Sequence, residues 1–453
     1  MMITHYAGWV WWLIVSLGIL VTFHEFGHFW VARRCGVRVL RFSVGFGRPI
    51  LRWHGRDGVE YVIGWIPLGG YVRMLDEREG EVPPEQVSQA FNRKSVYQRI
   101  AVVFAGPAFN LILCVALLWV MFMVGKADFQ PLVGQVQGVA AEAGFTRDDR
   151  ILAIDGQRMD TWTHAQMALA TAAIDHRPVE VEVMRGNGDS AALRLDLSNL
   201  VGKPDPGNAL RVIGIVPRQF LLESKVGAVS EGSAAAAAGL QADDRLLSID
   251  GHVLRSWDEV GAVVQERAAA DHPLQVVYER AGQRHEVLIQ PRLDESLSPP
   301  RWLLGIAAPR GTAEYDALLR YGPVDAMGAA VDETWRLTSA TMGIIWRMLR
   351  GAMSLESLNG PISIAQYASA SAQLGLAWFL SFLALLSLSL GIMNLLPIPI
   401  LDGGHLLYYL IEMVKGSPVS ERTMIAGQFV GMVLLVGLMG LAFYNDILRL
   451  VAS

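Results

Sequence analysis

The stretch His24-Glu25-Phe26-Gly27-His28 lies inside an apolar run, residues 7–32, that is long enough to cross a bilayer as a helix. A helix brings residues four apart onto one face, so both imidazoles can share a metal ion. Glu25 follows the first histidine and can reach the open side of such a metal, where a general base acts. A charge inside a membrane helix costs about 2.5 kcal/mol or more, so these residues predict a functional site. A soluble helix with solvent-facing His and Glu is the alternative, and the apolar flanks oppose it.

Hydrophobic residues make up 52% of the 453 residues before the 45 glycines are counted, and the net charge is −5. Soluble domains reach about 45–50% with glycine included. The composition therefore predicts a membrane protein whose surroundings include the lipid bilayer. The charge forms no long run of one sign, which argues against nucleic acid as a partner. The two cysteines, Cys35 and Cys114, give no disulfide framework.

Four apolar stretches have the length of about 20 residues that a helix needs to span about 30 Å of hydrocarbon. They are residues 7–32, 100–125, 374–396 and 424–444. The loop between the first two carries twelve Lys and Arg residues, whereas the tail before the first carries none. The positive-inside rule therefore places residues 33–99 in the cytoplasm and residues 126–373 on the opposite side of the membrane.

Residues 42–74 predict strands rather than a helix. Their β-rich segments flank a polar turn with Asp57-Gly58, which is a hairpin signal. The hairpin is apolar for a cytoplasmic loop, and Gly45 and Gly47 lie in its first strand. Non-helical backbone is tolerated at membrane depth where it lines a cavity, so we expect a membrane-reentrant β-hairpin beside the metal. A small hairpin in the cytoplasm is the alternative.

An internal repeat lies within residues 126–310. The run from Gly144 to Gly156 contains Asp-Asp-Arg-Ile-Leu-x-Ile-Asp-Gly, and it recurs from Gly239 to Gly251 as Asp-Asp-Arg-Leu-Leu-x-Ile-Asp-Gly. A repeat this long predicts two tandem domains, residues 126–221 and 222–310. The pattern resembles the PDZ domain, an α+β module that adds an extended peptide to a sheet edge. Two readings stay open, peptide-binding domains and degenerate domains that act as steric walls, because neither copy has a close match to the usual Gly-Leu-Gly-Phe loop.

Residues 323–356 have apolar side chains at three- to four-residue spacing, with arginines between them. This stretch is too charged to span a bilayer, so we expect an amphipathic helix on the membrane surface.

Residues 374–453, with the last two spans, carry the second half of the site. The third span ends in Asn394-Leu395-Leu396-Pro397-Ile398-Pro399-Ile400-Leu401-Asp402-Gly403-Gly404-His405. The two prolines end the helix, and Asp402 lies in the turn beyond them. Two histidines leave a catalytic Zn²⁺ one protein ligand short, and a carboxylate would complete the set with a position left for water. For Asp402 alone, an ordinary Asp-Gly turn is the alternative, and His405 could compete with it as a ligand.

Asn394 is an amide in an apolar helix, so we expect it either to bond an opened backbone carbonyl or to face the cavity and hold substrate.

The HExxH in the first span, the Asn-x-x-Pro-x-Pro-x-Leu-Asp-Gly run and the two repeats between them resemble the site-2 protease family of intramembrane zinc metalloproteases. The resemblance covers nearly the whole chain and is to the bacterial members with two PDZ domains. It implies Zn²⁺ as the cofactor and Glu25 as the catalytic base. It implies as Zn²⁺ ligands His24, His28 and Asp402. It implies as substrate-handling residues Asn394, Pro397, Pro399, and Gly45 and Gly47 of the hairpin.

The fold that follows is a polytopic α-helical membrane protein with four transmembrane helices, the first two within residues 1–125, a reentrant hairpin and two periplasmic PDZ domains. The resemblance implies a bacterial inner-membrane enzyme with its active site toward the cytoplasm. It also implies that single-pass membrane proteins such as the anti-sigma-E factor, and remnant signal peptides, are cut in their transmembrane segments. An inactive PDZ scaffold would need a broken ligand set, which the sequence does not show. A transporter would need inverted repeats, and four spans fit that poorly.

Overall fold

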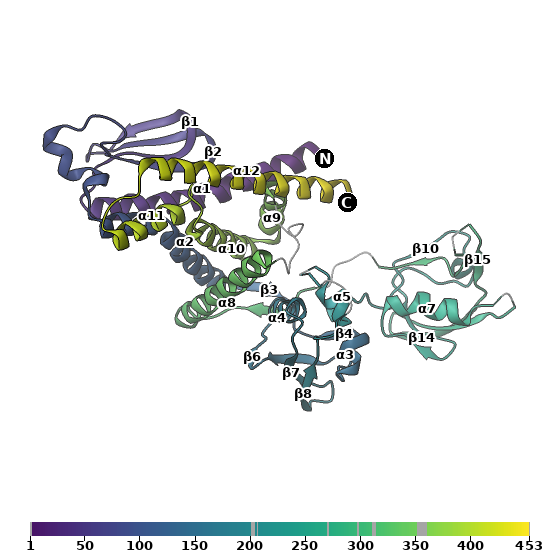
Figure 1. Ribbon diagram of the computed structural model, residues 1–453. Coiled ribbons are helices and arrows are strands. Elements are labelled where there is room, and N and C mark those ends of the chain that lie inside the picture. Colours follow the sequence, from purple (N-terminus) through teal and green to yellow (C-terminus); the bar gives the residue numbers. More distant parts are fainter. Residues whose placement is uncertain are drawn as a thin grey trace. The chain divides into compact units, whose positions relative to one another are not determined.

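The computed structural model describes residues 2–200, 204–205, 207–269, 271–296, 299–309, 314–350 and 360–452 (Figure 1). The chain divides into two compact units. The first, here called the helical unit, combines Met1–Lys126 with Leu319–Ser453. The second, here called the repeat unit, is Ala127–Leu318.

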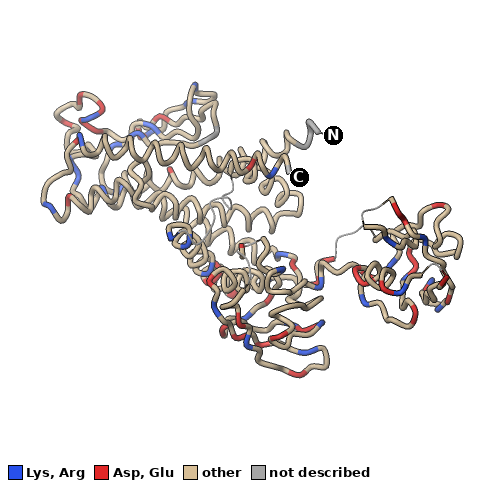
Figure 2. The backbone as a smooth tube through the Cα atoms, turned by 45° about the vertical axis from the view of Figure 1, so that its right-hand side comes forward, with Lys and Arg blue, Asp and Glu red and all other residues tan. Residues whose placement is uncertain are grey.

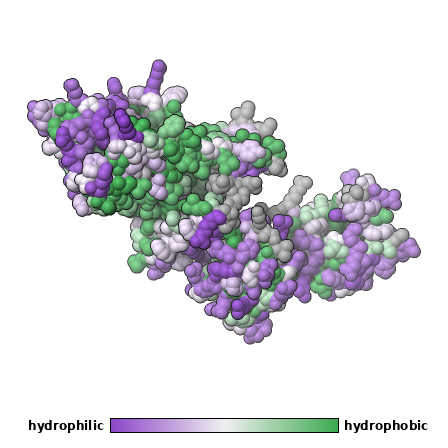
Figure 3. Space-filling model, viewed as in Figure 1, coloured by the Kyte–Doolittle hydropathy of each residue, from purple (hydrophilic) through white to green (hydrophobic). Residues whose placement is uncertain are grey.

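Among the described residues of the helical unit, four helices are long and apolar enough to cross a membrane: α1 (Met2–Arg34), α2 (Val96–Val124), α10 (Leu376–Leu395) and α12 (Glu421–Ala452). They coincide with the four stretches that the sequence predicts. Charged residues are sparse along these helices and gather at the end of the unit that carries the hairpin (Figure 2). An apolar surface follows the helices (Figure 3). The predicted polytopic membrane protein is therefore confirmed.

Local signals set the ends of these helices. A capping box starts α2, because Ser95 Oγ accepts from the Gln98 backbone N–H at 3.3 Å and Gln98 Oε1 accepts from the Ser95 N–H at 3.2 Å. Helix α10 stops two residues before Pro397. Gly375, with φ of 115°, separates α10 from α9 (Pro361–Leu374), a helix that the sequence did not predict.

Helix α2 is central to the unit. A buried cluster joins it to α10 and to α8 (Pro323–Leu349), and includes Cys114, Leu118, Ala326, Ala330, Ala384 and Leu388. On another side α2 meets α1 so closely that a Cβ atom at Gly27 would lie 2.4 Å from the Ala105 carbonyl oxygen. The part of the predicted surface helix from residue 351 to 356 lies outside the described residues.

The predicted hairpin is present as β1 (Val39–His54) and β2 (Glu60–Met74), which pair antiparallel. Residues 41–44 have partners in both halves of β2, since Val44 pairs with Gly70 and with Ile63. The sheet thus doubles back on itself and lies against α1 through a buried cluster that includes Phe29, Val39, Val59 and Val102. Two short 3-10 helices, Pro84–Gln89 and Phe91–Arg93, follow it before α2.

The repeat unit contains two four-stranded sheets with the same strand order. The first sheet has the order β6-β5-β7-β8 and the second β12-β11-β13-β14. In the first copy these are β5 (Arg150–Ile154), β6 (Gln157–Arg158), β7 (Val179–Met184) and β8 (Ser190–Leu195), with α4 (Trp162–Ile174). In the second they are β11 (Arg245–Ile249), β12 (His252–Val253), β13 (Leu274–Arg280) and β14 (Gln283–Ile289), with α7 (Trp257–Arg267).

Shorter elements complete the unit: β4 (Val133–Val136), α3 (Gly138–Glu142), α5 (Ala209–Ile213), β9 (Ile215–Pro217), β10 (Ala228–Val229), α6 (Ala234–Ala237), β15 (Arg292–Asp294), β16 (Arg301–Leu303) and β17 (Ile306–Ala307). Each copy has its own buried apolar core.

Candidate metal centre

Helix α1 presents His24 and His28 on one face, one turn apart, as the HExxH spacing predicts. Their ring centroids lie 4.9 Å apart and their Nε2 atoms 3.3 Å apart. His28 Nδ1 lies 2.8 Å from the carbonyl oxygen of Val102 in α2. A carbonyl oxygen only accepts hydrogen bonds, so this contact fixes the proton on Nδ1 and leaves Nε2 with a free lone pair.

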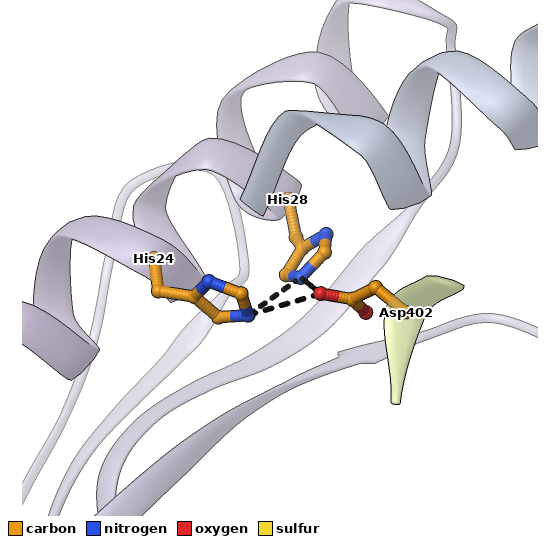
Figure 4. A group of neighbouring side chains, drawn as sticks. All are labelled: His24, His28 and Asp402. Atoms are coloured by element: carbon orange, nitrogen blue, oxygen red, sulfur yellow. Dashed lines mark hydrogen bonds and ion pairs between the residues drawn. The ribbon is translucent and has the colours of Figure 1, made fainter. Parts of the chain in front are cut away.

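Asp402 reaches the two histidines from the first turn of α11 (Asp402–Lys415), more than 370 residues later in the chain (Figure 4). Its Oδ2 atom lies 3.2 Å from Nε2 of His24 and 3.5 Å from Nε2 of His28. The turn that leads into Asp402 leaves no room for a side chain at either of the next two positions, Gly403 and Gly404. A Cβ atom at Gly403 would lie 2.2 Å from the Leu396 carbonyl oxygen, and one at Gly404 would lie 2.4 Å from that of Ile398.

Contacts with α2 hold α11 in this position. Arg99 of α2 donates to both carboxylate oxygens of Glu412, at 2.6 and 3.1 Å, and both side chains are largely buried. The Arg99 guanidinium also lies 4.8 Å from the centre of the Tyr409 ring. A bidentate pair of this kind fixes orientation as well as distance.

The three ligand atoms fit one tetrahedral cation. Zn²⁺ binds imidazole nitrogen and carboxylate oxygen at about 2.0–2.1 Å, which puts adjacent tetrahedral ligands about 3.3 Å apart. The separations here are 3.3 Å between the two Nε2 atoms and 3.2 and 3.5 Å from these to Asp402 Oδ2. Asp402 Oδ2 is buried and has no hydrogen-bond partner among the described residues. Lone pairs that converge in this way repel one another unless a metal ion or a proton lies between them.

Glu25 opens onto the same cavity as the ligand set. A cavity of about 520 Å³ is lined by Glu25, His28, Asp402 and His405 together with residues of β2, α2, α11 and α12. The β2 strand lies directly against Glu25, because a Cβ atom at Gly70 would be 2.9 Å from Glu25 Cγ. His405 faces the cavity and is not one of the three clustered ligands, and burial lowers the pKa of its imidazole. The Glu25 carboxylate, which can accept a proton, therefore lies beside the three convergent atoms.

The model of peptidase family M50 matches residues 12–438. The chain belongs to peptidase family M50. It is 47% identical over 440 residues to a protein of Xylella fastidiosa named "Putative zinc metalloprotease", with 97% of this chain and 98% of the relative covered. It is 42% identical to the protease RseP of Yersinia pestis and 41% identical to the regulator of sigma-E protease RseP of Escherichia coli, each with 96% and 98% covered.

The M50 match confirms the predicted site-2 protease family, the enzyme class and the dependence on zinc. A solved PDZ domain of a Listeria monocytogenes protein covers 18% of this chain and 84% of its own, at 21% identity and a TM-score of 0.17. That TM-score is too low to support an argument about the repeat domains.

The other predicted site residues of this M50 peptidase do not line the cavity. Asn394 lies in the last turn of α10 and is partly exposed, and its side-chain amide has no hydrogen bond within the part of the chain that the structure describes. Pro397 is exposed, whereas Pro399 is partly covered by α12, where Cβ atoms at Gly427 and Gly431 would lie 3.5 and 3.3 Å from its ring.

Gly45 and Gly47 have φ angles of 89° and 85°, a region that glycine adopts without strain. Gly45 is enclosed by its own sheet, since a Cβ atom there would lie 2.9 Å from the Ile66 carbonyl oxygen. The strand that reaches the cavity is instead β2, through Val72 and Met74.

Two residues of α2 contact the predicted zinc ligands and were missed by the sequence reasoning. A Cβ atom at Gly106 would lie 2.3 Å from His28 Nε2, and the Asn110 amide lies 3.2 Å from His24 Nδ1. The signal for Asn110 was available, because a carboxamide in an apolar span is as unusual there as in the third span.

Proposed function

We propose that this chain is an intramembrane endopeptidase that cuts the transmembrane segments of single-pass membrane proteins, with His24, His28 and Asp402 as the zinc ligands. The observation that carries the proposal is the set of three ligand-atom separations, which equal the edges of a zinc tetrahedron within about 0.2 Å. The ligands come from helices long and apolar enough to span a membrane and from the turn that follows one of them, so the chemistry takes place within the lipid.

Glu25 is the general base in this proposal. Zinc bound at the site supplies Lewis acidity toward a peptide carbonyl and toward water. Glu25 takes a proton from the attacking water as the new C–O bond forms at the carbonyl carbon. It then gives that proton to the amide nitrogen as the C–N bond breaks, so that a carboxylic acid and an amine are released. Its place in the cavity, beside His28 and Asp402, supports this role.

A transmembrane substrate has to be unwound before it is cut, because a helix satisfies its own amides and shields its carbonyls. In this proposal the unwound substrate segment is held in an extended form by pairing with the hairpin. The hairpin itself is a reentrant element at membrane depth. The exposed apolar residues Phe46, Ile50, Trp65 and Ile66 of the hairpin support that placement. The unbonded amide of Asn394 is free to hold an opened carbonyl, and Pro397 and Pro399 shape the adjoining turn.

The arginine-rich loop supports an orientation with residues 33–99 in the cytoplasm of a bacterial inner membrane and the repeat unit in the periplasm. We assign the two repeat domains to the PDZ class, as a steric filter or as peptide-binding modules. The substrates are anti-sigma-E factors and remnant signal peptides, on the strength of relatives named for regulation of sigma-E.

One experiment tests the assignment of the base and the ligands. The full chain is purified in detergent, and zinc content is measured beside cleavage of a single-pass model substrate. Glu25→Gln should keep zinc and lose cleavage by about 10²–10⁴-fold, whereas His24→Ala should lose both. A Glu25→Gln enzyme that still cleaves, or a His24→Ala enzyme with full zinc, would refute the corresponding role. Zinc content with no cleavage by the unmutated chain would favour the inactive scaffold.

A further inference from the structure

Asn110 is a fully buried amide in the apolar helix α2, and it contacts a proposed zinc ligand. Its exposed fraction is 0%, and its Nδ2 atom lies 3.2 Å from Nδ1 of His24. Its backbone is held separately, because Ser387 of α10 donates its hydroxyl to the Asn110 carbonyl oxygen at 2.8 Å. Among the described residues, the hydrogen-bonding contact of this side chain is with Nδ1 of His24.

The side-chain oxygen of Asn110 is buried with no hydrogen-bond partner among the described residues. Such an orphaned acceptor costs about 1–3 kcal/mol. Turning the planar amide by 180° exchanges its oxygen and nitrogen without changing the volume it fills. The oxygen then faces His24 Nδ1 and gains a donor there, while the amide N–H groups take the place that the oxygen leaves.

The zinc-binding form of His24 needs an acceptor at this place. A histidine that binds metal through Nε2 is neutral and carries its proton on Nδ1, which then donates to a neighbouring group. His28 meets this need with the Val102 carbonyl at 2.8 Å. His24 also directs Nε2 at the ligand cluster, 3.2 Å from Asp402 Oδ2. The group in contact with its Nδ1 is the Asn110 side-chain amide.

We infer that Asn110 is a positioning residue of the metal centre: its side-chain oxygen accepts the Nδ1 proton of His24 and so fixes the ring and tautomer that aim Nε2 at zinc. The inference rests on the proposed role of His24 as a ligand. The inference requires only an acceptor at this place, and an amide oxygen and a carboxylate oxygen can each serve as one.

The test measures zinc affinity of the full chain in detergent by competition with a chromophoric chelator, and the visible spectrum of the cobalt-substituted protein. Asn110→Leu, which keeps the branched shape of the side chain and removes the acceptor, should weaken zinc binding about 10–100-fold and alter the cobalt bands. Asn110→Asp restores an acceptor and should bind zinc within a few-fold of the unmutated chain. Ser387→Ala is the matched control, because it removes a hydrogen bond to the same residue's backbone, and it should leave zinc affinity unchanged.

Unchanged zinc affinity in Asn110→Leu would overturn the inference. So would a loss in Asn110→Asp as large as that in Asn110→Leu, since it would mean that the amide donates to His24. If Asn110→Leu does not fold, Asn110→Asp decides alone: retained affinity supports the inference, and a loss of 10-fold or more overturns it. His24→Ala separates this result from the proposed function, because full zinc in that variant would refute the ligand assignment itself, whatever Asn110 does.

Discussion

A Cβ atom at Gly106 would lie 2.3 Å from Nε2 of His28. Helix α2 packs so closely against the His28 imidazole that no side chain larger than hydrogen fits at position 106. The atom in the way belongs to a ring held at its other nitrogen by Val102, so the ring is not free to turn aside. The absence of a side chain at this position is a requirement of the site.

Gly106→Ala should therefore displace His28 from the ligand set and reduce zinc occupancy at least 10-fold, with cleavage lost in parallel. Alanine in a helix interior is otherwise favoured over glycine by about 0.5–1 kcal/mol, so a general loss of helix stability is not expected. Zinc content after dialysis against a weak chelator measures the effect.

Gly18→Ala is the matched control, since Gly18 lies in α1 with nothing within 4 Å of a Cβ atom placed there. It should keep zinc and activity. Wild-type zinc affinity in Gly106→Ala would show that α1 and α2 move apart easily enough to admit a methyl group between them.

Asp446 of α12 caps the first turn of α9 from outside that helix. Its buried carboxylate accepts from the backbone N–H groups of Gly360, Ile362 and Ser363 at 2.9–3.0 Å, and from the Ser363 hydroxyl at 2.6 Å. Asp446→Ala should leave these donors unpaired and lower the melting temperature in detergent. The expected loss is about 1–3 kcal/mol. Gly360→Ala should act in the same direction, because its Cβ atom would lie 2.5 Å from an Asp446 oxygen.

Asp332→Asn provides the comparison for Asp446→Ala, since Asp332 is an exposed carboxylate in α8. It should melt like the unmutated chain. Equal melting temperatures for Asp446→Ala and Asp332→Asn would mean that the cap contributes nothing to stability.

His405 should not be a zinc ligand. It lies one turn after Asp402 and faces the cavity, and the three clustered ligand atoms do not include it. His405→Ala should therefore bind one zinc per chain with an affinity within a few-fold of the unmutated enzyme, as measured by chelator competition. A loss equal to that of His28→Ala would show that His405 replaces a proposed ligand in solution.

The parts of the site that were predictable are those fixed by local geometry. The spacing of His24 and His28 determines their shared face on any helix, and a proline pair followed by Asp402 determines a turn after a span. The lengths of the apolar runs give the four helices. The meeting of α1 with α11 followed from the need of zinc for a third ligand, which is a chemical rather than a local argument.

The contributions of α2 could not be derived in this way. A helix that is apolar all round carries no amphipathic stripe to show which face points at a neighbour, so Gly106 and the Val102 carbonyl could not be placed. Helix α9 was not predicted because its sequence, rich in Ser and Ala, is not strongly apolar and its apolar residues do not recur at helical spacing. The double pairing of residues 41–44 depends on how the hairpin folds over itself, which strand composition does not encode.

The two repeats preserve one buried ion pair at the same internal position, Asp149 with Arg185 and Asp244 with Arg280, each at 2.6 Å. Burial alone would raise the pKa of Asp244, but two hydrogen bonds from Arg280 and one from the Gln241 backbone N–H outweigh burial and lower it. A carboxyl whose pKa is lower in the folded than in the unfolded chain stabilises the fold above the unfolded value, about pH 4. That stability is lost as the pH falls through the folded value.

Asp244→Asn should therefore destabilise the second repeat at pH 7, by about 1–3 kcal/mol, and its effect should shrink as the pH falls below about 4. Hydrogen exchange of peptides from β13 and β14, corrected for intrinsic rates and followed in the full chain, measures this. Glu266→Gln, an exposed carboxylate of α7, should show no such dependence. If Asp244→Asn destabilised the domain equally at pH 3 and pH 7, the lost contribution would be packing rather than charge, and the ion pair would not be what stabilises the sheet against the Gln241 turn.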